Sequence, residues 1–414
     1  MHRSGTDSPV SASRTAIPYR QFHVGLFVLA QFLYAVANYA YSPTLPLFVQ
    51  SKTGNLSLVG ITLSMYGLWQ MIIRLPLGIA TDRAGWCKPF IVAGFALAAL
   101  GAWLTGQAHD ITGLMVGRSL SGVAAGIFGP ILVVFSGLFL PHQSVQSFTI
   151  LTAVGAVGIM TSTLATGFLN EMGGYSLAFY VAAGAAVLAA LFVLPAYERR
   201  RPRQRVSARS VLSLITRRDV LIPALFCAAL QYTAAATTYG FLPILAGQMG
   251  ATGVTLSVLM STQVGLLTLG SVTAGLVVKR IGDRRLVALG LVMLSAGVGL
   301  ATVAPTIWML FVAQCFIGFS WGTCYPVITG MSIKQVADVG RNTAMGAFQM
   351  GCSVGVFAGS WISGMVADRL GIRPMFGLTG IGVLFLAILW TFRSTDAGSA
   401  GSGGSESLPA LEYR

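Results

Sequence analysis

Two arginines lie inside long apolar stretches of the sequence, where a charged side chain is energetically costly. Arg118 is the seventh residue of the stretch 112–139, and Arg74 lies eight residues before Asp82, near the end of the stretch 57–81. A charged side chain within a lipid-spanning segment costs at least ~2.5–3.5 kcal/mol on insertion scales, so such a residue is a functional candidate. Arg118 could bind an anion or take part in proton coupling, or it could brace a helix bundle. Arg74 could serve such a site or extend its side chain to nearby headgroups.

Polar and aromatic side chains gather in other apolar stretches. The amides Asn38 and Gln231 are the stronger candidates for a ligand site, because an amide in lipid is expensive unless it faces a cavity or a partner. Gln263, Gln314 and Gln349 are weaker candidates of the same kind. The aromatic candidates, each of which could instead serve helix packing or an interfacial belt, are Tyr34, Tyr39, Tyr41, Tyr232, Tyr239, Trp321 and Tyr325.

The composition indicates that the elements holding these residues span a membrane. The chain has 414 residues, of which 55% are hydrophobic and only 9% are charged, whereas soluble domains carry ~25% charged residues. Apolar stretches close to the ~20 residues needed to cross a bilayer recur from end to end. We expect an all-α membrane protein with twelve transmembrane helices at 22–49, 57–81, 89–107, 112–139, 144–170, 174–196, 220–247, 253–279, 285–305, 307–333, 341–368 and 373–392.

A basic segment divides the chain in two. The expected divisions are an N-terminal arm at 1–21, a six-helix half at 22–196, a basic linker at 197–219, a second six-helix half at 220–392 and a flexible tail at 393–414. The tail is rich in glycine, serine and alanine, a composition typical of flexible linkers. The basic linker could lie against anionic lipid, or it could serve only as a tether and a topology signal.

The positive charges predict how the chain sits in the membrane. With the N-terminus inside, 21 of the 26 lysines and arginines fall in cytoplasmic segments, while Lys52, Arg369 and Arg373 fall in outside loops. This is a strong positive-inside bias. Both termini and the linker are therefore expected in the cytoplasm, with the chain in the inner (plasma) membrane. Because the net charge of +14 lies in short loops and not on one face, it does not indicate nucleic-acid binding.

The sequence gives no indication of a disulfide framework, a cleaved signal peptide or a catalytic or metal site. Four of the five cysteines lie in apolar stretches, their number is odd, and nothing indicates a disulfide framework. The polar N-terminus lacks a hydrophobic region followed by a small-residue cleavage site, so no cleaved signal peptide is expected. The sequence shows no metal cluster, nucleophile–base pair or phosphate loop, so we expect neither an enzyme nor a metal or cofactor.

The two halves repeat at an offset of 197 residues. At this offset Leu45-Pro46 recurs as Leu242-Pro243, Gly78 as Gly275, Gly167 as Gly364 and Glu171 as Asp368, while Pro130 and Pro326 are 196 residues apart. Matches in this order, each at the same place in its span, indicate two parallel six-helix halves.

Two motifs resemble the major facilitator superfamily, and the resemblance covers about 22–392. The segment Gly78-x-x-x-Asp82-Arg83-x-Gly85-x-x-Lys88 is similar to that family's loop between helices two and three, and Leu114-x-x-x-Arg118-x-x-x-Gly122-x-x-x-Gly126 resembles its fourth-helix motif with a buried arginine. Trp86 and Cys87 stand where a basic pair is common, and the second copy of the loop has Lys279 in place of Asp82. The Gly-Pro pair of drug/proton antiporters is absent near Gly155–Met160, so the subfamily stays open.

The resemblance implies a central cavity that opens alternately to each side of the membrane. We expect the loop after the second span to act as a conformational latch, although a simple polar stop would also carry charges. With Asp82 and Arg83 partnered to the other half, the cytoplasmic side would stay closed. The expected latch residues are Gly78, Asp82, Arg83, Gly85, Lys88, Gly275 and Arg280.

The distribution of acidic residues restricts the substrate. All 12 aspartates and glutamates lie in tails, loops or span ends, whereas proton-coupled exporters of cationic drugs usually need a carboxylate within the membrane. We therefore expect a secondary active transporter of an anionic, zwitterionic or neutral small organic molecule. General resemblance to efflux members favours export, with protons as a possible coupling ion. The alternatives are an importer of an organic anion and a transporter-like receptor that binds without turnover. The expected partners are the substrate and bilayer lipid, and the expected state is a monomer.

Overall fold

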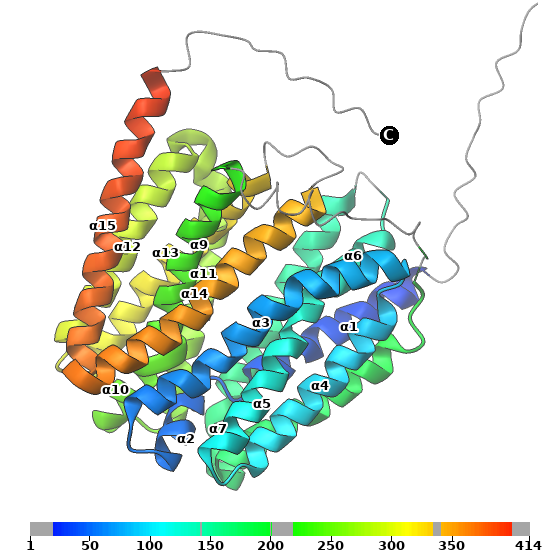
Figure 1. Cartoon of the computed structure of the whole chain (residues 1–414), viewed down its shortest axis with the longest axis horizontal. Coiled ribbons are helices and arrows are strands. Elements are labelled where there is room, and N and C mark those ends of the chain that lie inside the picture. The colour runs from blue at the N-terminus through cyan, green and yellow to red at the C-terminus, as the bar shows by residue number, and fades with distance from the viewer. Residues whose placement is uncertain (1–19, 141–142, 199, 201–217, 334–340, 400–414) are drawn as a thin grey trace, which may run out of the picture.

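The structure, a computed structural model, describes residues 20–140, 143–198, 200, 218–333 and 341–399, and every regular element in this part of the chain is a helix (Figure 1). Residues 1–19 of the expected arm, 201–217 of the linker and the tail from 400 onward lie outside the described residues.

The N-terminal half begins with a broken first span. Its elements are α1 (Arg20–Tyr39), α2 (Leu45–Lys52), α3 (Leu56–Ala84), α4 (Lys88–Gln107), α5 (Ile111–Ala124), the 3-10 turn η1 (Ala125–Ile127), α6 (Phe128–Gly137) and α7 (Ser144–Val193). The break between α1 and α2 contains Pro43 and precedes Pro46 in the first turn of α2. Proline lacks the N–H that a continuous helix would use and restricts the residue before it, so the span is interrupted there.

Two of the predicted spans are joined within α7. Its backbone leaves the helical region at Gly173 (φ −147°, ψ 22°) and Gly174 (φ 67°, ψ −176°). The positive φ at Gly174 is accessible to glycine at little steric cost. Eleven helices in the described residues are long and apolar enough to cross a membrane. Because α7 contains two spans, the predicted set of twelve transmembrane helices is confirmed.

The C-terminal half repeats this order. Its elements are α9 (Arg218–Ala236), the π-helical turn η3 (Thr237–Phe241), α10 (Leu242–Gln248), α11 (Gly253–Ile281), α12 (Asp283–Val303), α13 (Ile307–Ile333), α14 (Arg341–Leu370) and α15 (Ile372–Ser399). The first span is interrupted before Pro46, but the seventh span stays helical from Val220 to Gln248 and only widens to the π-helical turn η3 before Pro243. Helix α15 continues to Ser399, so the helix extends beyond the expected boundary at 392.

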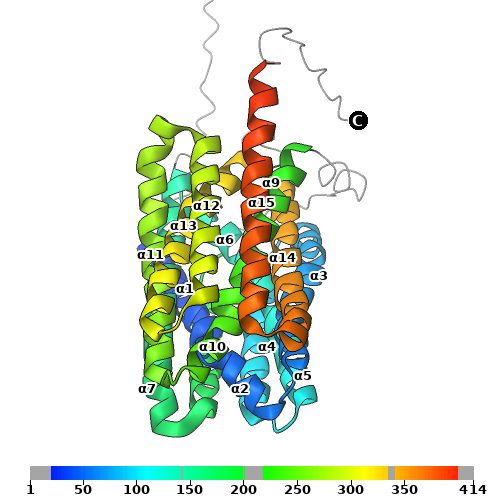
Figure 2. The ribbon, with the colours of Figure 1, turned by 90° about the vertical axis from the view of Figure 1, so that its left-hand side faces the viewer.

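The two halves lie side by side and meet along two seams (Figures 1 and 2). Helix α3 packs against α14 at one seam, and α7 packs against α11 at the other. We call the end of the bundle with the α3–α4 and α11–α12 connections the basic end. The opposite end, where α2 and α10 lie near the lower edge of Figure 1, is the far end.

Small residues bring both seams into close contact toward the far end. A Cβ atom added to Gly60 of α3 would lie 2.5 Å from the Ser360 carbonyl oxygen of α14, and one added to Gly167 of α7 would lie 2.5 Å from the Val254 Cα atom of α11. Such approaches require glycine, as in closely packed membrane helices. Gly364, which is the repeat equivalent of Gly167, lies against Gly60 at the first seam. The repeat seen in the sequence therefore corresponds to equivalent places in the two seams.

A carboxylate joins the halves at the far end. Asp368, at the end of α14, accepts a hydrogen bond from the Leu56 N–H at the start of α3, with a distance of 3.1 Å. At the second seam the hydroxyls of Thr163 and Ser261 lie 2.8 Å apart. The first of these contacts places a negative charge at the positive end of the α3 dipole. Hydrogen bonds therefore reinforce the tight packing of the far end.

Candidate functional site

A cavity of about 410 Å³ lies between the two halves in the middle of the bundle. Helices α1, α3, α5, α6 and α7 form one wall, and α9, α11, α13 and α14 form the other. The lining residues come from the central parts of their spans, where transporters of inverted or parallel repeats hold substrate. The volume falls within the range of about 300–1,000 Å³ typical of small-molecule sites. None of the described residues that line the cavity is acidic.

Most of the candidate binding residues line this cavity. The structure brings to it Tyr34, Asn38, Arg74, Arg118, Gln231, Tyr239, Trp321 and Tyr325. Of the weaker candidates, Gln349 also lines it, whereas Gln314 accepts a hydrogen bond from the Thr238 hydroxyl at 3.0 Å within the C-terminal half.

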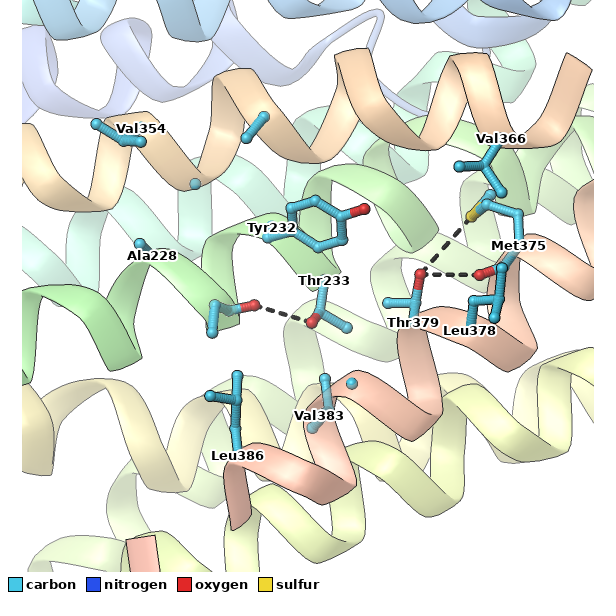
Figure 3. A pocket seen from close by; sticks show the side chains of 14 residues that line it. Ala228, Tyr232, Thr233, Val354, Val366, Met375, Leu378, Thr379, Val383 and Leu386 are labelled. Atoms are coloured by element: carbon cyan, nitrogen blue, oxygen red, sulfur yellow. Dashed lines mark hydrogen bonds between the residues drawn. The ribbon is translucent and has the colours of Figure 1, made fainter. Parts of the chain in front are cut away.

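Tyr41 and Tyr232 are placed elsewhere. Tyr41 is 3% exposed and stacks on Phe179 of α7, with 4.6 Å between ring centroids. Tyr232 lies in a separate apolar groove between α9, α14 and α15, where its hydroxyl oxygen accepts a hydrogen bond from Ser363 at 3.3 Å (Figure 3). Neighbouring residues on a helix point about 100° apart, so Gln231 can face the cavity while Tyr232 faces the groove. Neither tyrosine lines the central cavity, and each contacts a helix of its own half.

Arg118 is a buried cation whose Nε–H is an unused hydrogen-bond donor. It lies on α5, is 9% exposed, and its guanidinium carbon stands 4.7 Å from the centre of the Tyr66 ring. Its Nε atom is buried, and none of the described residues accepts a hydrogen bond from it. A cation–π contact contributes about 0.5–2 kcal/mol, but it does not use that N–H. A ligand oxygen could.

Two more residues that line this cavity have a buried polar atom without a hydrogen-bond partner among the described residues. The atoms are the indole Nε1 of Trp321 and the Oε1 of Gln31, and Gln31 is 3% exposed. Six buried side-chain nitrogen or oxygen atoms in the described residues lack a hydrogen-bond partner, and three of them belong to residues that line this cavity. Leaving such an atom unpaired costs about 1–3 kcal/mol. Their concentration at one place is the pattern expected of a site that a ligand completes.

Two other polar side chains on the α1 wall, Tyr34 and Asn38, already donate hydrogen bonds within the helix bundle. The Tyr34 hydroxyl donates to the Ala125 carbonyl at 3.2 Å, and the Asn38 side-chain nitrogen donates to the Tyr34 carbonyl at 2.7 Å. On the opposite wall, the Trp321 and Tyr325 rings stack with 4.5 Å between centroids and an interplanar angle of 10°. This wall therefore offers a flat aromatic surface.

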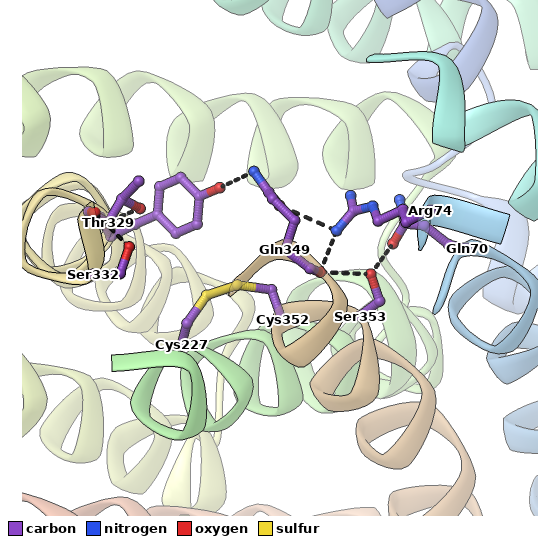
Figure 4. Close-up of a disulfide and its surroundings, with 9 residues drawn as sticks. Gln70, Arg74, Cys227, Thr329, Ser332, Gln349, Cys352 and Ser353 are labelled. Carbon is purple, nitrogen blue, oxygen red and sulfur yellow. Dashed lines mark hydrogen bonds between the residues drawn. A yellow bond between two sulfur atoms is a disulfide. The ribbon is translucent and has the colours of Figure 1, made fainter. Parts of the chain in front are cut away.

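Arg74 ties the two halves together across the cavity (Figure 4). Its guanidinium donates to the backbone carbonyl of Gln349 on α14 and, at 3.1 Å, to the side-chain oxygen of the same residue. The Gln349 amide donates in turn to the Tyr325 hydroxyl at 3.4 Å. One turn away, the Ser353 hydroxyl donates to the Gln70 side-chain oxygen at 3.3 Å. Arg74 is thus held by protein partners, and the alternative in which it reaches the headgroups does not apply to this arrangement.

A disulfide lies beside this bridge and corrects one expectation. Cys227 of α9 and Cys352 of α14 are bonded, with their Cα atoms 5.3 Å apart (Figure 4), a separation typical of disulfides. The odd cysteine count and the apolar surroundings gave no sign of this pair, because 125 residues separate its members and only the packing of α9 on α14 brings them together.

The last residues of the expected latch loop contact the segment that follows α7 in the same half. Glu198, after α7, accepts hydrogen bonds from the backbone N–H groups of Cys87 (2.5 Å) and Lys88 (2.8 Å) at the start of α4. The Lys88 ammonium donates to the Ala196 carbonyl at 3.0 Å. Gly85 ends α3 in the left-handed region (φ 65°). Glu198 therefore accepts hydrogen bonds from N–H groups that have no partner within α4, because they lie at its start. Sequence analysis did not assign this role to Glu198.

The remaining latch candidates lie near surfaces at the basic end. Arg83 and Arg280 are exposed, and a Cβ atom added to Gly78 or Gly275 would meet nothing within 4 Å. The role of the loop as a latch stays a prediction.

Some cavity residues were missed by sequence reasoning, although a signal was present. Tyr66 and Gln70 line the cavity and precede Arg74 on α3 at intervals of four residues. This spacing puts the three side chains on one helix face. Gln31 and Asn38 are seven residues apart on α1, which is about two helical turns, so they also share one face of their helix. A search for polar residues in register with the two arginines would have found them.

Comparison with known proteins agrees with this architecture. The family model of the Major Facilitator Superfamily matches residues 27–230 and 224–412. The inner membrane transport protein YajR of Escherichia coli is 23% identical over 82% of this chain and 75% of its own length. The quinolone resistance protein NorA of Staphylococcus aureus is 26% identical over 36% of this chain and 38% of its own. An uncharacterized transporter of Buchnera aphidicola is 28% identical over 34% of this chain and 35% of its own length.

Solved structures show the same fold at low sequence identity. The nucleoside transporter NupG superposes with a TM-score of 0.75 at 15% identity, covering 90% of this chain and 99% of the other. The human organic anion transporter MFSD10 superposes with a TM-score of 0.67 at 15% identity, covering 90% and 100%. The chain belongs to the major facilitator superfamily and is a membrane transporter of that type.

Proposed function

We propose that this transporter moves a small anionic, zwitterionic or neutral organic molecule by alternating access, and that the central cavity binds it. The observation that carries the proposal is a cavity with two arginines and, among its described lining residues, no carboxylate. Two positive charges without a counter-charge disfavour a cationic substrate. The unpaired Nε of Arg118 supplies a donor for an acceptor group on the substrate.

We also propose that the basic end faces the cytoplasm of the cell that holds the chain in its inner membrane. The distribution of 21 of 26 lysines and arginines supports this orientation. The tight far-end seams then correspond to an arrangement closed toward the outside. Export, coupled to protons, is the favoured direction, and the partial similarity to a quinolone resistance protein supports it.

Two other functions remain in competition. An importer of an organic anion would use the same cavity and the same Arg118. A receptor of transporter-like fold would bind a ligand in the cavity but would carry no flux. The composition of the cavity favours neither of them over export, so the experiment must separate all three.

Counterflow and pH-jump assays in proteoliposomes, with anionic, neutral and cationic compounds of similar size, test the proposal. We expect counterflow of anionic or neutral compounds and none of cations. Arg118→Ala should abolish or strongly reduce it, whereas Arg369→Ala, at an exposed far-end position, should not. Normal transport by folded Arg118→Ala protein would exclude both anion binding and coupling at this residue. Tight binding of one ligand without flux of any compound would favour the receptor.

A further inference from the structure

The unpaired polar atoms of the cavity-lining residues indicate which hydrogen-bonding groups the substrate carries, in addition to the sign of its charge. The Nε–H of Arg118 and the Nε1–H of Trp321 are donors only, so each requires an acceptor. The Oε1 of Gln31 is an acceptor and requires a donor. A carboxylate can pair with Arg118, but it leaves Gln31 unsatisfied. A complete ligand must therefore carry at least one hydrogen-bond donor as well as its acceptor groups.

The donor on the ligand must be uncharged. Arg74 and Arg118 both line the cavity, and the described lining residues include no acid that could hold an ammonium group. A hydroxyl group meets the requirement, because its O–H donates to the Gln31 oxygen without carrying a charge.

The aromatic surface indicates the body of the ligand. Trp321 and Tyr325 form a flat stack on α13, and Tyr39 and Tyr239 approach each other from opposite halves with 6.3 Å between ring centroids. Aromatic rings prefer offset-stacked or edge-to-face contacts with other rings. Arg74 is occupied by Gln349, so Arg118 is the arginine available as the anchor of the acid.

We infer that the substrate class of this transporter is hydroxylated aromatic carboxylates. The carboxylate binds Arg118 in the N-terminal half, the ring packs on Trp321 in the C-terminal half, and the hydroxyl pairs with Gln31. The inference rests on the proposed function for the location of the site and narrows its substrate. Because these contacts come from both halves, the bound molecule bridges them.

The test measures equilibrium binding of two probes to the purified full-length protein: 6-hydroxy-2-naphthoate and 2-naphthoate, which lacks the hydroxyl. We expect the hydroxylated probe to bind at least about fivefold more tightly, from the penalty of leaving Gln31 unpaired. In Gln31→Leu this preference should vanish. The matched control is Gln263→Leu, because Gln263 is also a buried glutamine with an unpaired Oε1 but does not line the cavity. It should keep the preference.

Two further variants test the other contacts. Arg118→Gln should weaken both probes by at least about tenfold, because it removes a charge-assisted hydrogen bond. Trp321→Phe keeps a ring but removes the N–H, and should weaken both probes by a few-fold. Equal affinity for the two probes in wild-type protein, or a preference that persists in Gln31→Leu, would overturn the inference. So would equally tight binding of 2-naphthylmethylammonium.

Flux separates this inference from the proposed function. Binding with the expected pattern but no counterflow would retain the ligand class and reject transport. Counterflow of other anionic or neutral compounds, with no binding of the hydroxylated probe, would retain transport and reject the ligand class.

Discussion

The contact between Asp368 and the start of α3 predicts a measurable shift in the conformational equilibrium. The carboxylate accepts from Leu56 N–H across the seam, so it acts only while the far end is closed. Asp368→Asn keeps a similar shape and an acceptor oxygen but removes the charge. The variant should therefore populate far-end-open conformations more than the wild-type protein does.

The magnitude follows from the position of the charge. A carboxylate at a helix N-terminus contributes typically about 0.3–1 kcal/mol when exposed to solvent, and Asp368 is exposed. A loss of about 0.3–1 kcal/mol changes an equilibrium constant by a factor of about 1.7 to 5, with RT near 0.59 kcal/mol. High salt should reduce the difference between the two proteins, because an exposed charge is screened.

Distance distributions between spin labels on the two halves would measure this shift. Labels at the exposed positions 52 and 306 report the far-end separation. Glu171→Gln is the matched control: Glu171 is the repeat-related residue of Asp368, and the described structure records no hydrogen bond from it to the opposite half. Equal distributions for wild-type and Asp368→Asn proteins at low salt, or an equal response of Glu171→Gln, would refute the reasoning.

Three other outcomes are expected. Asp82→Asn should slow transport in flux assays while substrate affinity stays within a few-fold; a large affinity loss without conformational bias would indicate a binding role instead. Gly60→Val should stop counterflow and widen the far-end distances, because a Cβ atom there would lie 2.5 Å from the Ser360 carbonyl oxygen; unchanged distances would contradict the close seam. Cleavage at a protease site inserted at 304–306 should leave two fragments that separate on gels only after reduction, because the bond between Cys227 and Cys352 spans that loop; separation without reductant would exclude the bond.

The sequence was sufficient for the architecture because the signals are local. Each span is a continuous apolar stretch, and the helix break in the first span and the π-helical turn in the seventh lie just before the prolines of Leu45-Pro46 and Leu242-Pro243. The turn at Gly173–Gly174 falls between two predicted spans. Hydropathy and proline restriction act within one segment, so they can be interpreted without knowledge of the packing.

The details of the site depend on contacts that one segment does not contain. Gln231 and Tyr232 are adjacent in sequence and were both candidates, yet the rotation of α9 puts one in the cavity and the other in the groove. The same limit applies to Glu198, whose role as a cap depends on the return of the chain to the start of α4. Helix rotation and long-range capping are set by packing, and composition does not reveal them.

The different roles of the two arginines illustrate what the packing adds. Insertion energetics treats Arg74 and Arg118 alike, since each is a charge in an apolar span. In the folded chain, Arg74 meets Gln349, which is 275 residues away and belongs to the other half. The Nε of Arg118 has no hydrogen-bond partner in the part of the chain that the structure describes. Arg74 thus stabilises the contact between the halves, and Arg118 has a donor left for a ligand. Replacing Arg74 should therefore alter the conformational equilibrium first, whereas replacing Arg118 should alter affinity first.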